Sequence, residues 1–288
     1  MHGMQVSALH DDFGVAVSGV DLNDVTADRL YPEIRALFET HSLLLFRNQS
    51  LSDAAHLALG ELFGPLEDRL DRPKPEIAPV ANVGEDGSII ATERDMRLLN
   101  LKANFLWHTD STFLPVPALA NILRARSLPD RDGNTEFASS RAGFARLPKS
   151  VQGRLRRTVF KHRYSHSRRK IDPELAQGAQ FHKWPDQVWR AVWRNPVTGA
   201  ESLYVASHVC AVDGVEDAAA QAFVDDLVTG MTGPDHVYSH QWKLGDVLIW
   251  DERAILHRGT PWPYEQKRDL ASICVSLRNV DGLAEMRA

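Results

Sequence analysis

The sequence predicts a mainly β fold with flanking helices (α+β), either a β-sandwich or a jelly roll. Three observations predict it. From about residue 78 onward, short runs with β character alternate with turn residues. Helical periodicity is confined to a few segments, as expected for outer helices. We found no repeat, low-complexity segment or Gly/Ser/Pro-rich linker in the 288 residues, a length that suits one large domain or two small ones. We therefore expect a single domain over residues 1–288.

The first 64 residues alternate between strand and helix patterns. The expected strands are residues 14–22 and 42–49, and the second of these reads as buried. The expected helices are residues 26–41 and 52–64, which carry apolar side chains at helical spacing. Thr26 and Ser52 are the expected N-caps, and Gly64 is the expected end of the second helix.

Beyond residue 78 the strand pattern dominates, with one more helix expected over residues 215–230. The expected strands lie within residues 80–83, 104–113, 119–127, 158–166, 189–207, 236–242, 245–258 and 269–277. A Pro-Val-Thr-Gly turn signal interrupts the run 189–207. The polar stretch 65–100 is long for a loop of a compact domain, and such loops often serve as lids.

Composition and net charge indicate which classes of protein the chain can belong to. Hydrophobic residues make up 43% of the chain, charged residues 25%, and the net charge is −5. These values are typical of a globular protein with a sizeable core and carry no basic bias for nucleic acid. We found no apolar run long enough for a membrane span and no signal-peptide pattern, so we expect a cytoplasmic protein with a small-molecule substrate and no nucleic-acid or membrane partner. A homo-oligomer is compatible with the sequence. Cys210 and Cys274 read as free core thiols.

A His-x-Asp pair lies within the run 104–113. In an extended strand, residues i and i+2 point to the same side, so the imidazole of His108 and the carboxylate of Asp110 would leave one face together. Such a pair supplies two ligands of a metal site. The alternative is an ordinary strand histidine that is hydrogen-bonded to a nearby carboxylate.

His257 is the expected third ligand. It follows the buried run VLIW and precedes a turn with Gly259 and Pro261. Two histidines and one carboxylate match the facial triad of non-heme Fe(II) oxygenases, which leaves one face of the ion open. A structural zinc site would more often have four ligands rich in cysteine, and neither cysteine here has metal-site spacing.

Two further residues fit a carboxylate site near such a metal. Arg268 lies where the strand 269–277 begins, and a buried arginine there suits bidentate binding of a carboxylate. Thr135, in the run GNTEF, offers a hydroxyl for the same carboxylate. The alternatives are a surface ion pair of Arg268 with Asp269 or Glu265, and a simple turn around Thr135.

In this order and at these spacings, the motifs H-x-D, G-x-T-x-F, G-D-x-x-x-W-D, H-R and the downstream arginine resemble the Fe(II)- and 2-oxoglutarate-dependent dioxygenases of the taurine dioxygenase and 2,4-dichlorophenoxyacetate dioxygenase group. The N-terminal runs SGVDL and LLLFRNQSLS extend the resemblance to nearly the whole chain. The resemblance implies a double-stranded β-helix (jelly roll) and an enzyme that uses Fe(II), 2-oxoglutarate and dioxygen. It carries His108, Asp110 and His257 over as catalytic iron ligands. It also carries Thr135 and Arg268 over as contacts to the distal carboxylate of 2-oxoglutarate.

The implied reaction is hydroxylation of an aliphatic C–H bond of a small organic substrate. The best match is an aryloxyalkanoate-like acid, because hydroxylation next to an ether oxygen gives a hemiacetal that falls apart and so cleaves the ether. Members of the group that act on such anions commonly have a second arginine four residues beyond the first. Here that position is Ser272. An anionic substrate would then meet another partner, and the expected ones are His208, Arg163, Arg168 and Lys102.

Other functions stay open at this point. One is hydroxylation of a bulkier, non-anionic metabolite on the same scaffold. Another is a metal-dependent hydrolase or isomerase, which would need neither dioxygen nor Arg268. A third is a non-catalytic sensor that binds 2-oxoglutarate, although an intact ligand set argues against it.

Overall fold

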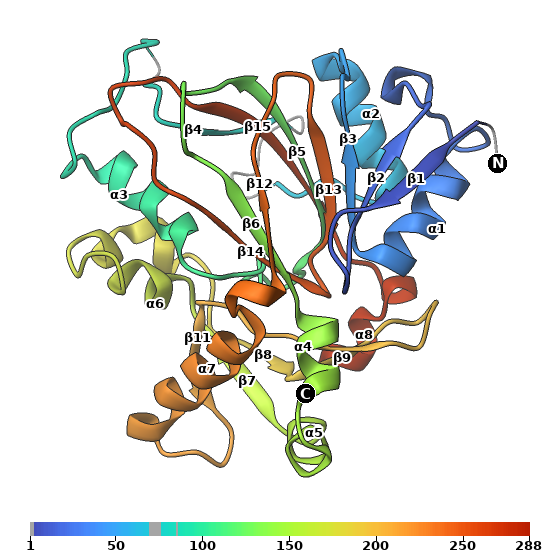
Figure 1. Cartoon of the computed structure of the whole chain (residues 1–288). Coiled ribbons are helices and arrows are strands. Elements are labelled where there is room, and N and C mark those ends of the chain that lie inside the picture. The colour runs from blue at the N-terminus through green and yellow to red at the C-terminus, as the bar shows by residue number, and fades with distance from the viewer. Residues whose placement is uncertain (1–2, 69–75, 85) are drawn as a thin grey trace.

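Figure 1 shows the computed structural model of the chain, which describes residues 3–68, 76–84 and 86–288. The strands are β1 Gln5–Ala8, β2 Val15–Ser18, β3 Leu43–Phe46, β4 Ala78–Ala81, β5 Ala118–Ser127, β6 Thr135–Ser139, β7 Val159–His162, β8 Gln187–Arg190, β9 Val192–Arg194, β10 Glu201–Leu203, β11 Val209–Val212, β12 Val237–His240, β13 Val247–Asp251, β14 Ile255–Gly259 and β15 Asp269–Ser276. The α-helices are α1 Tyr31–His41, α2 Asp53–Phe63, α3 Met96–Lys102, α4 Ser140–Arg146, α5 Lys149–Leu155, α6 Tyr164–Arg169, α7 Asp217–Met231 and α8 Leu283–Met286.

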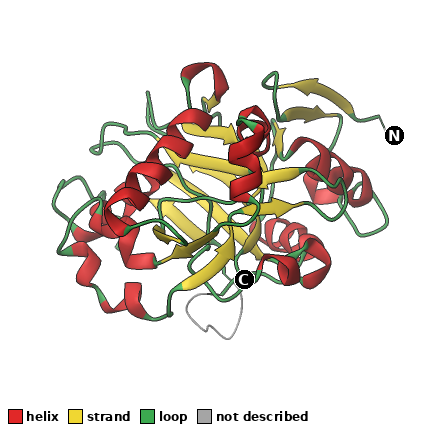
Figure 2. Ribbon diagram, turned by 90° about the horizontal axis from the view of Figure 1, so that it is seen from below, coloured by secondary structure: helices red, strands yellow, loops and turns green. Residues whose placement is uncertain are grey.

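Two sheets build the centre of the molecule, and helices lie around them (Figure 2). Their neighbouring strands are antiparallel, except that β2 and β3 of the larger sheet pair in parallel. The larger sheet has the strand order β1-β2-β3-β13-β5-β15-β4, and the smaller one has the order β12-β6-β14. Side chains from both sheets share one buried cluster, which joins Phe137 and Ile255 of the smaller sheet to Leu248 and Leu270 of the larger sheet. This arrangement confirms the predicted jelly roll with flanking helices.

Strand β13 shows why the sheets lie where they do. Its sequence, VLIWD, is buried at every position. Because successive side chains of a strand point to opposite faces, Val247 and Ile249 pack under the N-terminal helices while Leu248 and Trp250 face the smaller sheet. A continuous apolar run is what a central strand with two covered faces requires.

The N-terminal helices differ from the prediction at one end. Ser52 caps α2 as predicted, because its hydroxyl accepts from the N–H of Ala55 at 3.1 Å, and the helix ends before Gly64. The Thr26 cap is wrong. Thr26 pairs its backbone with Arg29 in a turn, and Leu30 adopts φ 66°, so the helix begins only at Tyr31.

Two of the expected strands are wrong in part. Residues 104–113 form no regular strand, since the chain turns at Ser111, where φ is 61°, and keeps a single bridge between His108 and His257. Residues 158–166 begin as β7 but continue as helix α6. Helices α3, α4 and α5 were not predicted, because each spans only seven residues and shows too short a periodic pattern.

The stretch 65–100 contains β4 and the beginning of helix α3. Residues 69–75 and 85 of this stretch lie outside the described residues. Among the helices that the structure does describe, none combines the length and the apolar character needed to cross a membrane.

Candidate active site

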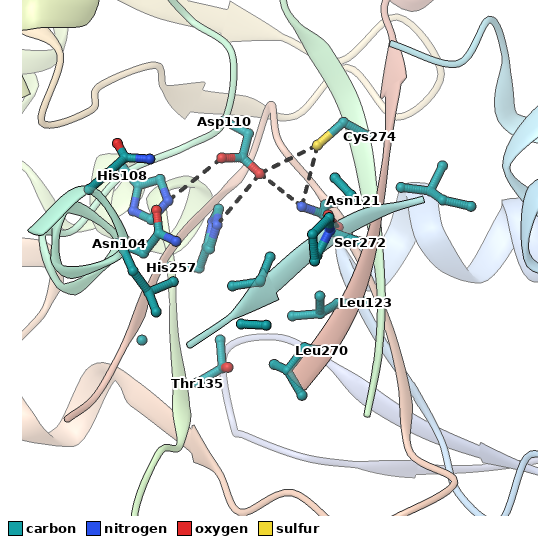
Figure 3. Close-up of a pocket in the computed structure, with 18 of the residues that line it drawn as sticks. Asn104, His108, Asp110, Asn121, Leu123, Thr135, His257, Leu270, Ser272 and Cys274 are labelled. Carbon is teal, nitrogen blue, oxygen red and sulfur yellow. Dashed lines mark hydrogen bonds and ion pairs between the residues drawn. The ribbon is translucent and has the colours of Figure 1, made fainter. Parts of the chain in front are cut away.

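A cavity of about 460 Å³ opens beside the two facing sheets. Its wall brings together residues that are far apart in the sequence, and Figure 3 shows how they lie. Of the sequence-predicted residues, those on this wall are His108, Asp110, Thr135, Arg168, His257, Arg268 and Ser272. The candidate site is therefore built from the loop before β5, the start of β6, strand β14 and strand β15.

The two histidines and the aspartate form one cluster. Asp110 Oδ1 lies 3.6 Å from His108 Nε2, and Asp110 Oδ2 lies 3.8 Å from His257 Nε2. One ligand atom from each residue can be chosen so that all lie within 4.8 Å of one another. Reciprocal backbone hydrogen bonds of 3.0 and 2.8 Å between His108 and His257 hold the two imidazoles side by side. Tertiary pairing, and not a continuous strand, thus brings the three groups together.

The protonation of the cluster suits a divalent metal ion. His108 Nδ1 lies 2.7 Å from the Leu106 carbonyl, a contact in which Nδ1 donates and the Nε2 lone pair faces Asp110. Burial, and then the nearby His108, lower the pKa of His257 to about 3, so this imidazole is neutral at neutral pH. Neutral imidazoles and a carboxylate are the donors that Fe(II) accepts in a facial arrangement. The residues present therefore fit the ion that the sequence predicts.

Behind this cluster lies a buried carboxyl that sequence reasoning missed. Glu252 Oε2 accepts from Thr109 Oγ1 at 2.6 Å and from the Asp110 N–H at 2.8 Å. The same oxygen lies 3.8 Å from His257 Nδ1, a ring nitrogen without a hydrogen-bond partner among the described residues. Burial, and then the charge of Asp110, raise the pKa of Glu252 well above its usual value. Outer groups of this kind orient metal ligands.

Arg268 and Thr135 form a second polar pair on the same wall. Arg268 is 3% exposed, its Nε donates to the Gly133 carbonyl at 3.0 Å, and its guanidinium lies 5.0 Å from the centre of the Trp262 ring. No carboxylate of the described residues lies within 4 Å of it, and burial alone lowers its pKa to about 10. A buried cation without a counter-charge is a strong site for an anion.

The Thr135 hydroxyl is held by a residue that the sequence analysis did not identify. Trp242 Nε1 donates to Thr135 Oγ1 at 3.0 Å. Because the tryptophan N–H can only donate, the threonine oxygen accepts here and its own proton is left to point elsewhere. Thr135 is 4% exposed and lines the cavity, so the hydroxyl can donate to a ligand beside Arg268.

The residues considered for substrate contact, which are Ser272 and the expected partners His208, Arg163, Arg168 and Lys102, lie in different places. Ser272 lines the cavity. Arg163 does not, because its guanidinium makes two hydrogen bonds of 2.8 and 2.7 Å to Asp186. Lys102 lies outside the cavity wall as well, with Nζ 5.1 Å from the centre of the Tyr264 ring. His208 is buried behind the wall, where its Nδ1 lies 3.3 Å from Thr112 Oγ1.

Residues 161–170, KHRYSHSRRK, form a basic segment, and from it Arg168 and Tyr164 reach the cavity wall. Its guanidinium is 4.4 Å from the centre of the Tyr164 ring, and its Nε donates to Asn100 Oδ1 at 3.1 Å. The α6 helix explains the difference from Arg163. Residues four apart share a helix face, so Tyr164 and Arg168 point the same way, while Arg163 precedes the helix and turns to Asp186.

Comparison with known proteins agrees with this geometry. A profile described as "Taurine catabolism dioxygenase TauD, TfdA family" matches residues 5–274. The chain is 32% identical over 270 residues to an (S)-phenoxypropionate/alpha-ketoglutarate-dioxygenase of Sphingobium herbicidovorans, covering 91% of each chain. It is also 32% identical to an alpha-ketoglutarate-dependent 2,4-dichlorophenoxyacetate dioxygenase of Cupriavidus pinatubonensis, covering 91% of this chain and 94% of that one.

A solved structure extends the likeness to three dimensions. The crystal structure of AAD-2 in complex with Mn(II) and N-oxalylglycine superposes with a TM-score of 0.88 at 29% identity, covering 95% of this chain and 96% of that one. The family profile spans nearly the whole chain, and the structure has the fold and the cluster of donor atoms that the family chemistry needs. The chain therefore belongs to the taurine catabolism dioxygenase TauD, TfdA family and is an Fe(II)- and 2-oxoglutarate-dependent dioxygenase.

Proposed function

We propose that this dioxygenase hydroxylates an aryloxyalkanoate-like carboxylic acid at the carbon next to the ether oxygen, so that the ether is cleaved. In this proposal His108, Asp110 and His257 hold Fe(II), and Arg268 with Thr135 binds the distal carboxylate of 2-oxoglutarate. The observation that carries the proposal is one cavity with a two-histidine, one-carboxylate cluster on one part of its wall. Another part of the wall holds a buried arginine that has no carboxylate partner among the described residues.

The residues of the chain bind, orient and exclude water. The bound iron supplies the oxidative chemistry that couples decarboxylation of 2-oxoglutarate to attack on a C–H bond. Leucine and tryptophan side chains of the larger sheet keep this part of the cavity apolar, with Leu123, Trp250 and Leu270 on its wall. In such surroundings the charge of Arg268 attracts a carboxylate much more strongly than it would in water. Arg268 thereby holds 2-oxoglutarate by its distal carboxylate, at the end away from the reacting carbonyl.

The substrate class rests on two kinds of support. Relatives at 32% identity are named for phenoxypropionate and for 2,4-dichlorophenoxyacetate, which are both acids with an aryl ether. Within this chain, Arg168 offers a cation on the cavity wall beside the aromatic ring of Tyr164. An aromatic acid needs both a charge partner and a ring contact, so we assign the substrate carboxylate to Arg168 in place of the absent arginine at position 272.

A direct test compares three compounds in an assay that measures succinate. We expect turnover of an aryloxyacetate, weaker turnover of its neutral amide, and little or none of taurine. Arg168→Gln should reduce the preference for the acid over the amide at least tenfold, because one charge-assisted pair is lost. Arg163→Gln is the matched control, because that arginine lies only five residues away but pairs with Asp186 outside the cavity.

The outcomes separate the parts of the proposal. Efficient taurine turnover would contradict the substrate class. An unchanged preference for the acid in Arg168→Gln would remove Arg168 from the substrate site and leave the oxygenase intact. Metal binding tests the ligand set independently, since His108→Ala, Asp110→Ala and His257→Ala should each abolish tight binding of Mn(II) while the protein still unfolds cooperatively.

A further inference from the structure

A chain of hydrogen bonds runs along the cavity wall from Ser272 through Asn121 to Asp110 (Figure 3). Asn121 Nδ2 donates to Asp110 Oδ2 at 2.8 Å, and the Ser272 hydroxyl lies 3.0 Å from Asn121 Oδ1. Cys274 completes the group, with its sulfur 3.7 Å from the same Asp110 oxygen. All of these side chains line the cavity, so the network faces the site itself.

Two paired strands hold the network rigidly. Strands β5 and β15 are antiparallel neighbours in the larger sheet, and Asn121 lies opposite Cys274 in their register. Ser272 is two residues from Cys274 and therefore on the same face of β15. Asn121 is 5% exposed and Ser272 is 4% exposed, so neither side chain can exchange its partner freely for water.

Ser272 fixes which end of the Asn121 amide faces the aspartate. An asparagine amide has a donor end and an acceptor end, and exchanging them would set the carbonyl oxygen against the negative charge of Asp110. The serine hydroxyl donates to that carbonyl oxygen and so keeps the NH₂ group on Asp110. Without this hydroxyl, a buried acceptor would lose its partner and the amide would be free to turn.

The Asn121 amide donates to Oδ2 of Asp110. A carboxylate can bind a metal through one oxygen or through both. We propose that Asn121, locked by Ser272, is a positioning residue for Asp110: it occupies Oδ2 so that the carboxylate presents only Oδ1 to the metal. A carboxylate that bound through both oxygens would fill a position that the co-substrate needs. The inference rests on the proposed role of Asp110 as a ligand.

The test uses Mn(II) alone as a probe on the full-length protein. We expect Asn121→Leu, which has similar volume and no polar group, to weaken Mn(II) binding by roughly 10- to 100-fold. Water proton relaxation reports the number of water molecules on the bound ion. Three protein ligands leave three positions on an octahedral ion, so release of Oδ2 should lower the relaxation enhancement per bound Mn(II) by about a third.

Ser272 variants keep the test informative if Asn121→Leu folds poorly. Ser272→Ala should shift both measurements in the same direction by a smaller amount, and Ser272→Thr should restore them because it keeps the hydroxyl. Ser276→Ala is the matched control, on the same strand but outside the cavity wall. Its Mn(II) affinity should equal that of the unaltered protein.

Two results would overturn the inference. One is an Asn121→Leu protein with unchanged Mn(II) affinity and relaxation. The other is a Ser272→Ala protein that cannot be distinguished from Ser276→Ala. Asp110→Ala distinguishes this failure from failure of the proposed function. If Asp110→Ala loses Mn(II) while the Asn121 and Ser272 variants keep it, the ligand assignment stands and only the positioning role falls. Retention of Mn(II) by Asp110→Ala would refute the ligand assignment itself.

Discussion

Replacement of Arg268 by methionine should abolish tight binding of 2-oxoglutarate and leave metal binding unchanged. Methionine is apolar and long enough to fill the same space beside Trp262. The side chain it replaces is 3% exposed and has no carboxylate partner within 4 Å among the described residues. A carboxylate bound there is taken out of water, so loss of the cation leaves it buried and unpaired. That loss typically costs about 2–5 kcal/mol, or roughly 30- to 5000-fold in the dissociation constant.

The measurement is an anaerobic titration of the Fe(II)-loaded protein with 2-oxoglutarate, followed by its visible charge-transfer absorption. Arg268→Lys should lie between the two extremes, since an ammonium keeps the charge but not the paired donors. Arg258→Met is a suitable control, because Arg258 is on strand β14 but pairs with Glu136 at 2.7 Å and does not line the cavity. Thermal unfolding gives a second readout, because 2-oxoglutarate should stabilise only the proteins that bind it.

The pH dependence of this binding follows from the same burial. Burial lowers the pKa of Arg268 to about 10, so the guanidinium is charged throughout the neutral range and loses its proton only as the pH rises through that value. Affinity for 2-oxoglutarate should therefore be level up to about pH 9 and fall above pH 10. An Arg268→Met protein that binds 2-oxoglutarate within threefold of the unaltered affinity would refute the reasoning, because another cation would then hold the carboxylate.

Three further predictions concern residues around the site. Trp242→Phe should weaken 2-oxoglutarate binding by about 1 kcal/mol, because Thr135 loses the donor that orients its hydroxyl; the same titration checks this, and equal affinity would count against it. Glu252→Ala should weaken Mn(II) binding roughly tenfold by removing the acceptor of Thr109 and of the Asp110 N–H, and unaltered Mn(II) affinity would contradict it. Burial lowers the pKa of His162 from 6.5 to about 3, so the unfolded chain binds more protons below pH 6.5 and stability falls as the pH drops towards 3. His162→Phe should remove about 2 kcal/mol of the stability lost between pH 7 and pH 5, as measured by urea unfolding, and an unaltered pH dependence would rule this out.

The parts of the fold that sequence predicted well are those where one local pattern is enough. The VLIW run is apolar at every position and became the central strand β13, and Ser52 capped its helix because capping depends only on the next turn of backbone. The run 104–113 failed for the opposite reason. Its aromatic and β-branched residues suit a strand, but Ser111 turns the chain at positive φ and only a bridge to His257 sets the position of His108. No pattern within ten residues of the His-x-Asp motif indicates that His108 pairs with His257.

In the candidate site, the sequence predicted the residues that line the cavity but not the side chains that orient them. The types His, Asp, Thr and Arg at set spacings were enough to predict which groups line the cavity, because their chemistry is specific. Their orienting partners were not predictable, since an amide, an indole or a buried carboxyl has many ordinary uses and no fixed distance in sequence from the group it serves. Trp242 reaches Thr135 from the loop after β12, and Glu252 reaches Asp110 from the turn after β13.

Ser272 shows how much can be inferred when one expected arginine is absent. From sequence alone, the serine only removes an expected arginine and leaves an anionic substrate without its usual partner. In the structure its hydroxyl has a partner of its own, Asn121, and we infer that the position serves the metal side of the cavity and not the substrate side. An anionic substrate would then need a cation elsewhere. We assign that role to Arg168, which lies beside Tyr164 on the part of the cavity wall formed by α6. The two assignments depend on each other: adding an arginine at position 272 should disturb Asp110 through Asn121 before it improves the binding of any anion.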